Sequence, residues 1–269
     1  MTSSDPYRAT WRLPEHEVLC LGPRRYAHAL VIPVINEGGR IQRQLKEIMA
    51  ANLPVDVVIA DGGSTDGSVD PEFLAEVGVR CRLTKTGPGR LSAQLRMAYA
   101  WCLDEGYLGV VTMDGNGKDN VEAVSQFVAR LEAGYGYVQG SRYQPGGVAE
   151  NTPLDRTLGN RCVHAPILSL AAGRWFTDTT NGFRGYSRDY LADPRLAAFR
   201  DVFSNYELLF YLTVRAHRLG YRVCELPVRR SYPVGEATPT KIGGLSGKLA
   251  LLSQTLGAAM GRYNPPRTQ

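Results

Sequence analysis

The chain has 269 residues, of which 43% are hydrophobic and 21% are charged, as in an ordinary globular protein. This composition excludes disordered, collagen-like and coiled-coil proteins, and the length suits one large α/β domain with at most a modest appendage. The net charge of +5 mildly favours an anionic ligand, although a scattered solvated surface explains it equally well. No basic run with interleaved aromatic residues indicates nucleic acid.

The cysteine pattern and the chain termini bear on the compartment. Five widely spaced cysteines contain no CxxC pair, which indicates a reducing compartment without a zinc site. The first residues lack the apolar core of a signal peptide, and no segment reaches about 18 uninterrupted apolar residues. We therefore expect a cytoplasmic protein, with contact at a membrane surface left open. Residues 243–261 predict a packed amphipathic helix or, alternatively, a weakly interfacial one, and it could join two subunits.

The predicted elements alternate through the first half of the chain. Residues 1–26 are polar and are expected to be an irregular extension or cover over the core. Apolar runs at 28–33, 55–61, 79–84, 108–114 and 135–143 predict strands, and helical spacing predicts helices at 38–52, 90–106 and about 120–132. This alternation indicates a mostly parallel sheet with helices on both faces. Ligands of such sheets bind outside the carboxyl ends of the strands, where polar clusters stand in this sequence.

The second half is more helical. We predict helices at 155–173 and 204–220, a loop at 177–187 and one strand at 221–232. No linker or internal repeat separates the halves, so we expect one continuous domain.

The first two strand ends carry Pro33, Asn36, Glu37 and Asp61. Asn36 and Glu37 could simply start a helix, and Asp61 could cap a turn. A carboxylate at Asp61 would also suit the hydroxyl or amino groups of a nucleoside. The glycine-rich turn "GPGRLSAQLRMA" places Ser92 where a dinucleotide fingerprint needs glycine or alanine, which argues against a Rossmann dehydrogenase.

The stretch "VVTMDGNGKDN" places Asp114 and Asn116 directly after an apolar run. A calcium loop starting at Asp114 would need glycine at its sixth position and glutamate at its twelfth, but these are Asp119 and Ser125. The oxygen donors suit Mg²⁺ or Mn²⁺ shared with substrate phosphates. The alternative is a polar turn in which Asp119 or Asn120 caps the next helix.

Nine motifs in register resemble the inverting family 2 glycosyltransferases of the GT-A fold, most of all the polyprenyl-phosphate mannose and glucose synthases. They are "VIPVINE", "VIADGGSTDGS", "GPGRLSAQLRMAYA", "VTMDGNGKD", "GSRY", "DTTNGFRGY", "NYELLFYL", "ELPV" and "TKIG". The resemblance implies an N-terminal extension at 1–27, a GT-A domain at 28–245, and a C-terminal amphipathic helix and tail at 246–269. It also implies a hexosyltransferase that uses a nucleoside-diphosphate sugar, GDP- or UDP-linked, with inversion.

The resemblance assigns donor-binding and metal-binding positions. Asp114 and Asn116 match the two ends of the family's Asp-x-Asp, which holds a divalent cation, Mg²⁺ or Mn²⁺, against the donor diphosphate. The remaining donor positions are Pro33, Asn36, Glu37, Asp61, Gly89, Gly115 and Lys118.

Acceptor and catalytic positions follow in the same way. Arginine suits an acceptor phosphate because its guanidinium bonds phosphate oxygens in a bidentate manner, although each arginine could instead be a solvated surface residue. The residues matched to the acceptor side are Arg142, Arg156, Arg184, Arg229, Arg230 and Lys241. A cation held at Asp114, together with basic side chains, is expected to assist departure of the leaving group. A phosphate acceptor needs no strong base, whereas a hydroxyl acceptor would need one, for which Asp178 and Glu207 are candidates. Glu207 could equally be a structural partner of an arginine.

Two departures from the family pattern stand beside Asp114. Asn116 replaces the second aspartate and should weaken cation binding, while Lys118 adds a positive charge that could contact phosphate directly. We therefore keep two alternatives to a polyprenyl-phosphate acceptor: transfer to a hydroxyl of a soluble metabolite or glycan, and a non-catalytic partner subunit that binds a sugar nucleotide. A nucleotidyltransferase is less favoured because no glycine-rich phosphate loop with a basic residue follows the first strand.

Overall fold

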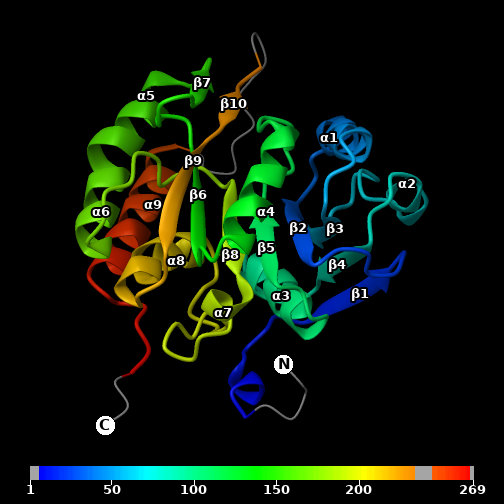
Figure 1. Ribbon diagram of the computed structural model, residues 1–269, viewed down its shortest axis with the longest axis horizontal. Helices are drawn as coiled ribbons and strands as arrows, with labels where there is room; N and C mark the ends of the chain where they lie inside the picture. The colour runs from blue at the N-terminus through cyan, green and yellow to red at the C-terminus, as the bar shows by residue number, and fades with distance from the viewer. Residues whose placement is uncertain (1–5, 234–243, 267–269) are drawn as a thin grey trace.

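The computed structural model describes residues 6–233 and 244–266. In that part of the chain an eight-stranded sheet has the order β1-β4-β3-β2-β5-β8-β6-β9, and a separate two-stranded sheet pairs β10 with β7 (Figure 1). The strands are β1 His16–Cys20, β2 His28–Val34, β3 Asp56–Asp61, β4 Cys81–Lys85, β5 Gly109–Thr112, β6 Tyr137–Ser141, β7 Val148–Glu150, β8 Arg184–Ser187, β9 Val223–Pro227 and β10 Arg229–Ser231.

The sheet is mostly parallel. β4, β3, β2 and β5 are parallel neighbours, as are β6 and β9, while β8 runs antiparallel between β5 and β6, and β1 runs antiparallel beside β4. The parallel strands therefore end at one edge, the edge at which β7 and β10 lie (Figure 1). Every loop that follows a parallel strand contributes to this edge, which is where a ligand is expected.

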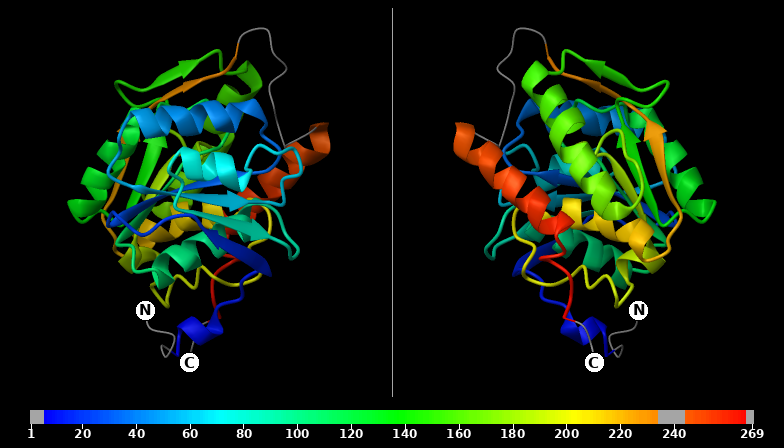
Figure 2. Two further views of the ribbon diagram at one scale, coloured as in Figure 1. Left: turned by 90° about the vertical axis from the view of Figure 1, so that its right-hand side faces the viewer. Right: turned by 90° about the vertical axis from the view of Figure 1, so that its left-hand side faces the viewer.

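Helices cover both faces of the sheet (Figure 2). One apolar core lies between the sheet and α3, α6 and α8, and the other lies between the sheet and α1, α2 and α4. Strands buried on both faces need near-continuous apolar sequence, which β2 and β3 supply. The helices are α1 Gly39–Ala50, α2 Pro71–Glu76, α3 Leu91–Asp104, α4 Val124–Glu132, α5 Leu154–Leu158, α6 Ala165–Ala172, α7 Arg188–Leu191, α8 Glu207–Arg218 and α9 Gly244–Ala259. Shorter turns lie at Arg8–Thr10, Val121–Ala123 and, as a π-helix, Gly159–His164.

The expected sheet flanked by helices and the main helices of both halves are confirmed, as is the packed C-terminal helix, because α9 lies against α6 and α8. Thr255 of α9 is buried and its hydroxyl lies 2.8 Å from Nδ1 of His164. No helix in the described ranges is long and apolar enough to cross a membrane.

Three local predictions are wrong. The N-terminal segment is not irregular throughout, because β1 pairs with β4 across its whole length, although Trp11 does cover the core by stacking on Phe199 at 3.9 Å. The loop predicted at 177–187 contains β8, whose pairing comes from its neighbours rather than from an apolar run. The single strand predicted at 221–232 is instead two strands in different sheets. Between them, the Val228 amide donates to the Ser141 carbonyl of β6, and the Val228 carbonyl accepts from the Val148 amide of β7, so the chain passes here from one sheet to the other.

Candidate functional site

The loops after β2 and β3 are tied to each other at the carboxyl edge. Asn36 has a positive φ of 49°, its side-chain oxygen accepts from the Thr65 amide at 2.8 Å, and its own amide donates to Ser64. Asn tolerates this left-handed conformation better than most residues. Asp61 is buried and accepts hydrogen bonds from the amides of Gly63 and Ser64. These contacts hold the loops after β2 and β3 together at the carboxyl edge.

Two of the residues expected to bind the nucleotide-sugar donor are glycines that the backbone conformation requires. A Cβ on Gly115 would lie 3.0 Å from the carbonyl oxygen of Pro33, so the Asp114 loop rests on the end of β2. Gly89 has a φ of +102°, which side-chain-bearing residues rarely adopt, and it starts the turn into α3. Glu37 lies 3.4 Å from Arg40 at the start of α1.

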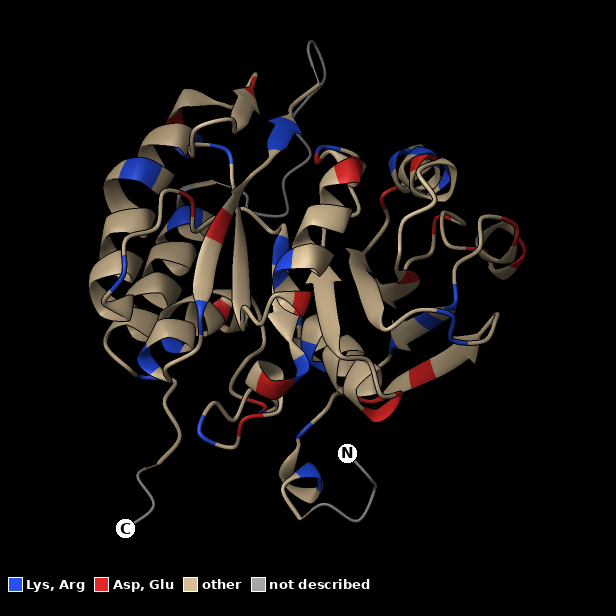
Figure 3. Ribbon diagram, viewed as in Figure 1, with Lys and Arg blue, Asp and Glu red and all other residues tan. Residues whose placement is uncertain are grey.

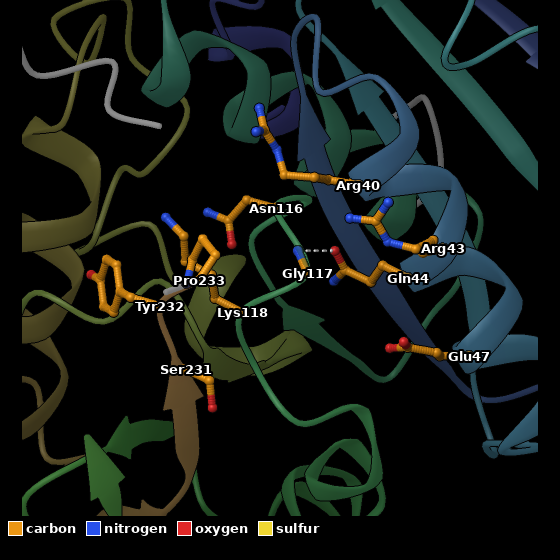
Figure 4. Close-up of a pocket in the computed structure, with 10 residues that line it drawn as sticks. All are labelled: Arg40, Arg43, Gln44, Glu47, Asn116, Gly117, Lys118, Ser231, Tyr232 and Pro233. Atoms are coloured by element: carbon orange, nitrogen blue, oxygen red, sulfur yellow. Dashed lines mark hydrogen bonds between the residues drawn. The ribbon is translucent and has the colours of Figure 1, made fainter. Parts of the chain in front are cut away.

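The Asp114 loop is held from α1 by Gln44. The Gln44 amide nitrogen donates to the Asp114 carbonyl at 2.9 Å. The Gln44 side-chain oxygen accepts from the Gly117 amide at 2.8 Å, a bond that Figure 4 shows as a dashed line. Beside this clamp lies an open pocket of about 250 Å³. It is lined by Arg40, Arg43, Gln44, Glu47, Asn116, Gly117, Lys118, Ser231, Tyr232 and Pro233.

Arg230 of β10 reaches the Asp114 carboxylate. Its Nη2 lies 2.8 Å from Asp114 Oδ2 and its Nη1 lies 2.5 Å from Asp119 Oδ2. The side chains of Arg230 and Asp119 are 7% and 0% exposed, whereas that of Asp114 is 29% exposed. Burial raises the pKa of Asp119, and the Arg230 charge opposes that rise. The inward-facing carboxylates thus share one buried guanidinium.

Positive side chains gather around Tyr232, next to Asp114. The Lys118 ammonium lies 4.6 Å from the centre of the Tyr232 ring, and the guanidinium carbons of Arg156 and Arg230 lie 5.6 and 5.9 Å from it. Burial alone would raise the pKa of Tyr232, but the charges of Arg230, Arg142 and Arg156 lower it below its ordinary value. Burial, and after it the Arg230 charge, lower the pKa of Lys118. The basic side chains therefore act electrostatically on both Tyr232 and Lys118.

Arg142 and Asp178 form a buried, bidentate ion pair. Arg142 Nε lies 2.7 Å from one carboxylate oxygen and Nη2 lies 3.0 Å from the other. Burial would lower the pKa of Arg142, but the Asp178 carboxylate raises it above its ordinary value. Asp178 also accepts from the backbone amides of Arg142 and Thr180. Its oxygens are thus engaged in holding Arg142, which leaves it poorly placed as a base.

Glu207 is the first residue of α8 rather than an interior one. Its Oε2 accepts from the backbone amides of Ser204 at 3.1 Å and Asn205 at 2.5 Å. The carboxylate therefore stabilises the turn that enters the helix, in keeping with the structural alternative, although an amide pair and not an arginine is its hydrogen-bond partner.

The assignment of Arg184 to the acceptor is corrected by its position. Arg184 is 1% exposed, and its three nitrogens donate to the carbonyls of Asn181, Leu209 and Thr179. Because all three nitrogens of the Arg184 guanidinium bond buried carbonyls, the side chain holds the loop before β8 in place. It cannot reach a phosphate outside the core.

The remaining residues expected on the acceptor side lie in different surroundings. Arg229 points away from Arg230, is exposed, and pairs with Glu150 at 3.0 Å. Arg156 is half-buried at Tyr232, with its Nη1 lying 3.4 Å from the hydroxyl. Lys241 lies outside the described residues.

Two functional neighbours are absent from the sequence-based set, Gln44 and Tyr232. Gln44 is 1% exposed and lies on the face of α1 that also buries Ile41 and Leu45. A polar residue in this otherwise apolar stripe of the sequence could have indicated its role. Tyr232 carried no such signal, because its place depends on the break between β9 and β10.

The residues at Asp114 do not fit a divalent cation as they are arranged. Carboxylate and amide oxygens are suitable donor types, and Asn116 Oδ1 is buried without a hydrogen-bond partner. However, the Asp114 carboxylate already holds Arg230, and Lys118 adds a second positive charge nearby. Across residues 6–233 and 244–266 no group of three His, Cys, Asp or Glu side chains could hold a metal ion.

Comparisons with known proteins identify the family of the chain. The sequence model of Glycosyl transferase family 2 matches residues 29–193. A polyprenol monophosphomannose synthase of Mycolicibacterium smegmatis is 29% identical over 244 residues, covering 88% of this chain and 89% of the relative. An undecaprenyl-phosphate mannosyltransferase of Micrococcus luteus is 30% identical over 203 residues, covering 74% and 81%.

Solved structures show the same fold. Glucosyl-3-phosphoglycerate synthase from Mycobacterium tuberculosis, in complex with Mn²⁺ and uridine-diphosphate-glucose, superposes with a TM-score of 0.61 at 21% identity, covering 88% of this chain and 79% of that one. The expected GT-A fold is thereby confirmed. The chain belongs to glycosyl transferase family 2 and is a glycosyltransferase.

Proposed function

We propose that the chain transfers a hexosyl group from a GDP- or UDP-linked sugar, with inversion, to polyprenyl phosphate. The observation that carries this proposal is the gathering of Lys118, Arg156 and Arg230 around Tyr232, beside Asp114. Figure 3 shows the basic strand β10 at this edge of the sheet. Guanidinium groups bind phosphate oxygens well, and two phosphate-bearing ligands would meet here. The names of the two curated relatives point to the same acceptor class.

In this proposal the donor lies over the loops after β2, β3 and β5. Asn36 and Asp61 would border the nucleoside, and the Asp114 loop would face the diphosphate. Positive charge at Lys118 would stabilise the negative charge that develops on the leaving diphosphate. Arg142, held in position by Asp178, and Arg156 would orient the acceptor phosphate.

The bonds that already engage both candidate bases support a phosphate acceptor over a hydroxyl. An acceptor phosphate is already anionic and attacks without losing a proton in the step, whereas a hydroxyl needs a base within about 3 Å. The two candidate bases, Asp178 and Glu207, are committed to Arg142 and to the amides before α8.

A lipid acceptor also requires access from a membrane surface. Leu154 and Leu158 lie one helical turn apart on α5 and are 73% and 52% exposed, close to Arg156 in sequence. Lys248 of α9 bonds Asp155 at 2.8 Å, which joins α9 to this end of α5. We propose that this apolar and basic surface makes peripheral contact with an anionic membrane.

The test is transfer of label from GDP-mannose and UDP-glucose to undecaprenyl phosphate. We expect label in the organic phase with one of the two donors, and an inverted anomer in the product by NMR. Label only in water-soluble products would contradict the lipid acceptor. For the surface, Leu154→Ser with Leu158→Ser should reduce sedimentation with phosphatidylglycerol vesicles at least threefold without changing transfer to a detergent-dispersed acceptor.

The divalent cation that the sequence resemblance implies at Asp114 and Asn116 is not part of this proposal, because the Asp114 carboxylate already holds Arg230. The likeness to the Mn²⁺-bound structure, at 21% identity, concerns the fold. Any cation that used Asp114 would have to compete with Arg230.

A further inference from the structure

Arg230 is fixed in place by its strand and by two carboxylates. It follows the crossing at Val228, and its backbone forms a bridge with Asp119, while the neighbouring Arg229 faces outward. Its Nη1 and Nη2 each bond a different carboxylate, at 2.5 Å to Asp119 and 2.8 Å to Asp114. The Asp119 side chain is fully buried. If Arg230 left the cluster, the Asp119 carboxylate would remain as a buried charge without a partner, which is strongly unfavourable.

The charges around Asp114 are balanced by the protein itself. Asp114 and Asp119 contribute two negative charges, and Arg230 and Lys118 contribute two positive ones. Asn116 is neutral where a second carboxylate would stand in the family pattern, and its buried Oδ1 has no hydrogen-bond partner. Among the described residues, no carboxylate lies within ion-pair distance of the Lys118 ammonium, which lies over the face of the Tyr232 ring.

We propose that Arg230 takes the place at Asp114 that a divalent cation takes at an Asp-x-Asp pair, so that the donor diphosphate is bound without a cation. Lys118 then supplies the positive charge that the diphosphate meets. The part of this inference that concerns the diphosphate rests on the proposed function, whereas the competition between Arg230 and a cation for Asp114 does not.

The first test uses Mn²⁺ alone, measured by electron paramagnetic resonance of the free ion in the presence of the purified protein. We expect the wild-type chain to bind Mn²⁺ at least tenfold more weakly than the Asn116→Asp variant, which restores the second carboxylate without breaking the buried pair. The double variant Asp119→Asn with Arg230→Gln should also bind Mn²⁺ at least threefold more tightly, because it frees Asp114 while leaving no buried charge unpaired. Arg222→Gln, an exposed arginine away from the cluster, is the control for surface charge and should match the wild type.

Tight binding of Mn²⁺ by the wild-type chain, equal to that of Asn116→Asp, would overturn the competition. Because Asn116→Asp keeps Arg230 and Asp119 intact, this comparison stands even if the double variant fails to fold.

The second test measures the affinity for GDP and UDP by calorimetry, in EDTA and in Mn²⁺. For the wild-type chain we expect the preferred nucleotide to bind within threefold under the two conditions, and for Asn116→Asp we expect binding at least tenfold tighter with Mn²⁺. Wild-type affinity that rises tenfold or more with Mn²⁺ would refute cation-free diphosphate binding. If neither nucleotide binds under any condition, the proposed donor is wrong, while the first test still decides whether Arg230 excludes the cation.

Discussion

Replacing Asp178 with asparagine should destabilise the protein far more than an ordinary charge change does. The substitution keeps the side-chain size but removes the charge opposite Arg142, whose side chain is 4% exposed. Removing one partner of a buried ion pair costs about 3–5 kcal/mol, and we expect a value near 3 because the amide oxygen still accepts one of the two hydrogen bonds. At about 2 °C per kcal/mol for a domain of this size, Tm should fall by roughly 6 °C.

Urea unfolding followed by circular dichroism measures this loss. Lys248→Gln is a matched control, because its pair with Asp155 has the same kind of contact at 2.8 Å, but the two side chains are 61% and 54% exposed. Exposed pairs contribute less than about 1 kcal/mol. If Asp178→Asn lowered the free energy of unfolding by less than about 1 kcal/mol, the reasoning would be refuted. If Asp178 were a base instead, the variant would lose the acidic limb of its kcat/KM profile while keeping its stability.

Three further outcomes follow from the packing. Gly182→Ala would place a methyl group against Asp114 Oδ1 and should lower kcat/KM at least tenfold, measured with saturating acceptor; unchanged kinetics would contradict the position of Asp114. Arg184→Gln should lower the free energy of unfolding by about 3 kcal/mol, because buried carbonyls lose their donors, whereas a raised acceptor KM at full stability would restore the acceptor role. Burial lowers the pKa of His164, so as pH falls below about 6.5 the unfolded chain takes up the proton first and stability is lost; urea midpoints at pH 7.5 and pH 5 should show this, and His164→Gln should reduce the difference.

Much of the fold could be predicted because parallel strands buried on both faces need apolar runs. β2 and β3 have such runs, and polar residues mark where each ends. β8 has none: its "RGYS" forms a strand because β5 and β6 pair with it from both sides. β1 lies at the sheet edge with three of its five residues exposed and none buried, so its sequence carries a weak pattern. Local sequence therefore reports burial well and tertiary pairing poorly.

The site follows the same division. Asp114 and Asn116 could be placed at the carboxyl edge from their position after a strand, and their departure from the family pattern was visible in the sequence. The bond between Arg230 and Asp119 joins residues 111 positions apart. Which of Arg229 and Arg230 turns inward depends on the break after Pro227, since moving one residue along a strand reverses the side-chain direction. Sequence alone left both arginines in one acceptor group, and the structure separates them.

The electrostatics of Asp114 decide whether a cation can bind in the wild-type chain. Two unit charges about 4 Å apart interact by about 4 kcal/mol at an effective dielectric constant near 20, so a divalent cation would gain about 8 kcal/mol from Asp114. A guanidinium about 4 Å from the same cation would oppose it by about 8 kcal/mol, which leaves almost no net gain before the cost of dehydrating the ion. A second carboxylate at position 116 would add about another 8 kcal/mol and restore a favourable balance. The residues at positions 116 and 230 both change the electrostatic energy of a cation at Asp114. The cation requirement of this chain should therefore depend on these two residues rather than on the fold that it shares with a Mn²⁺-bound structure.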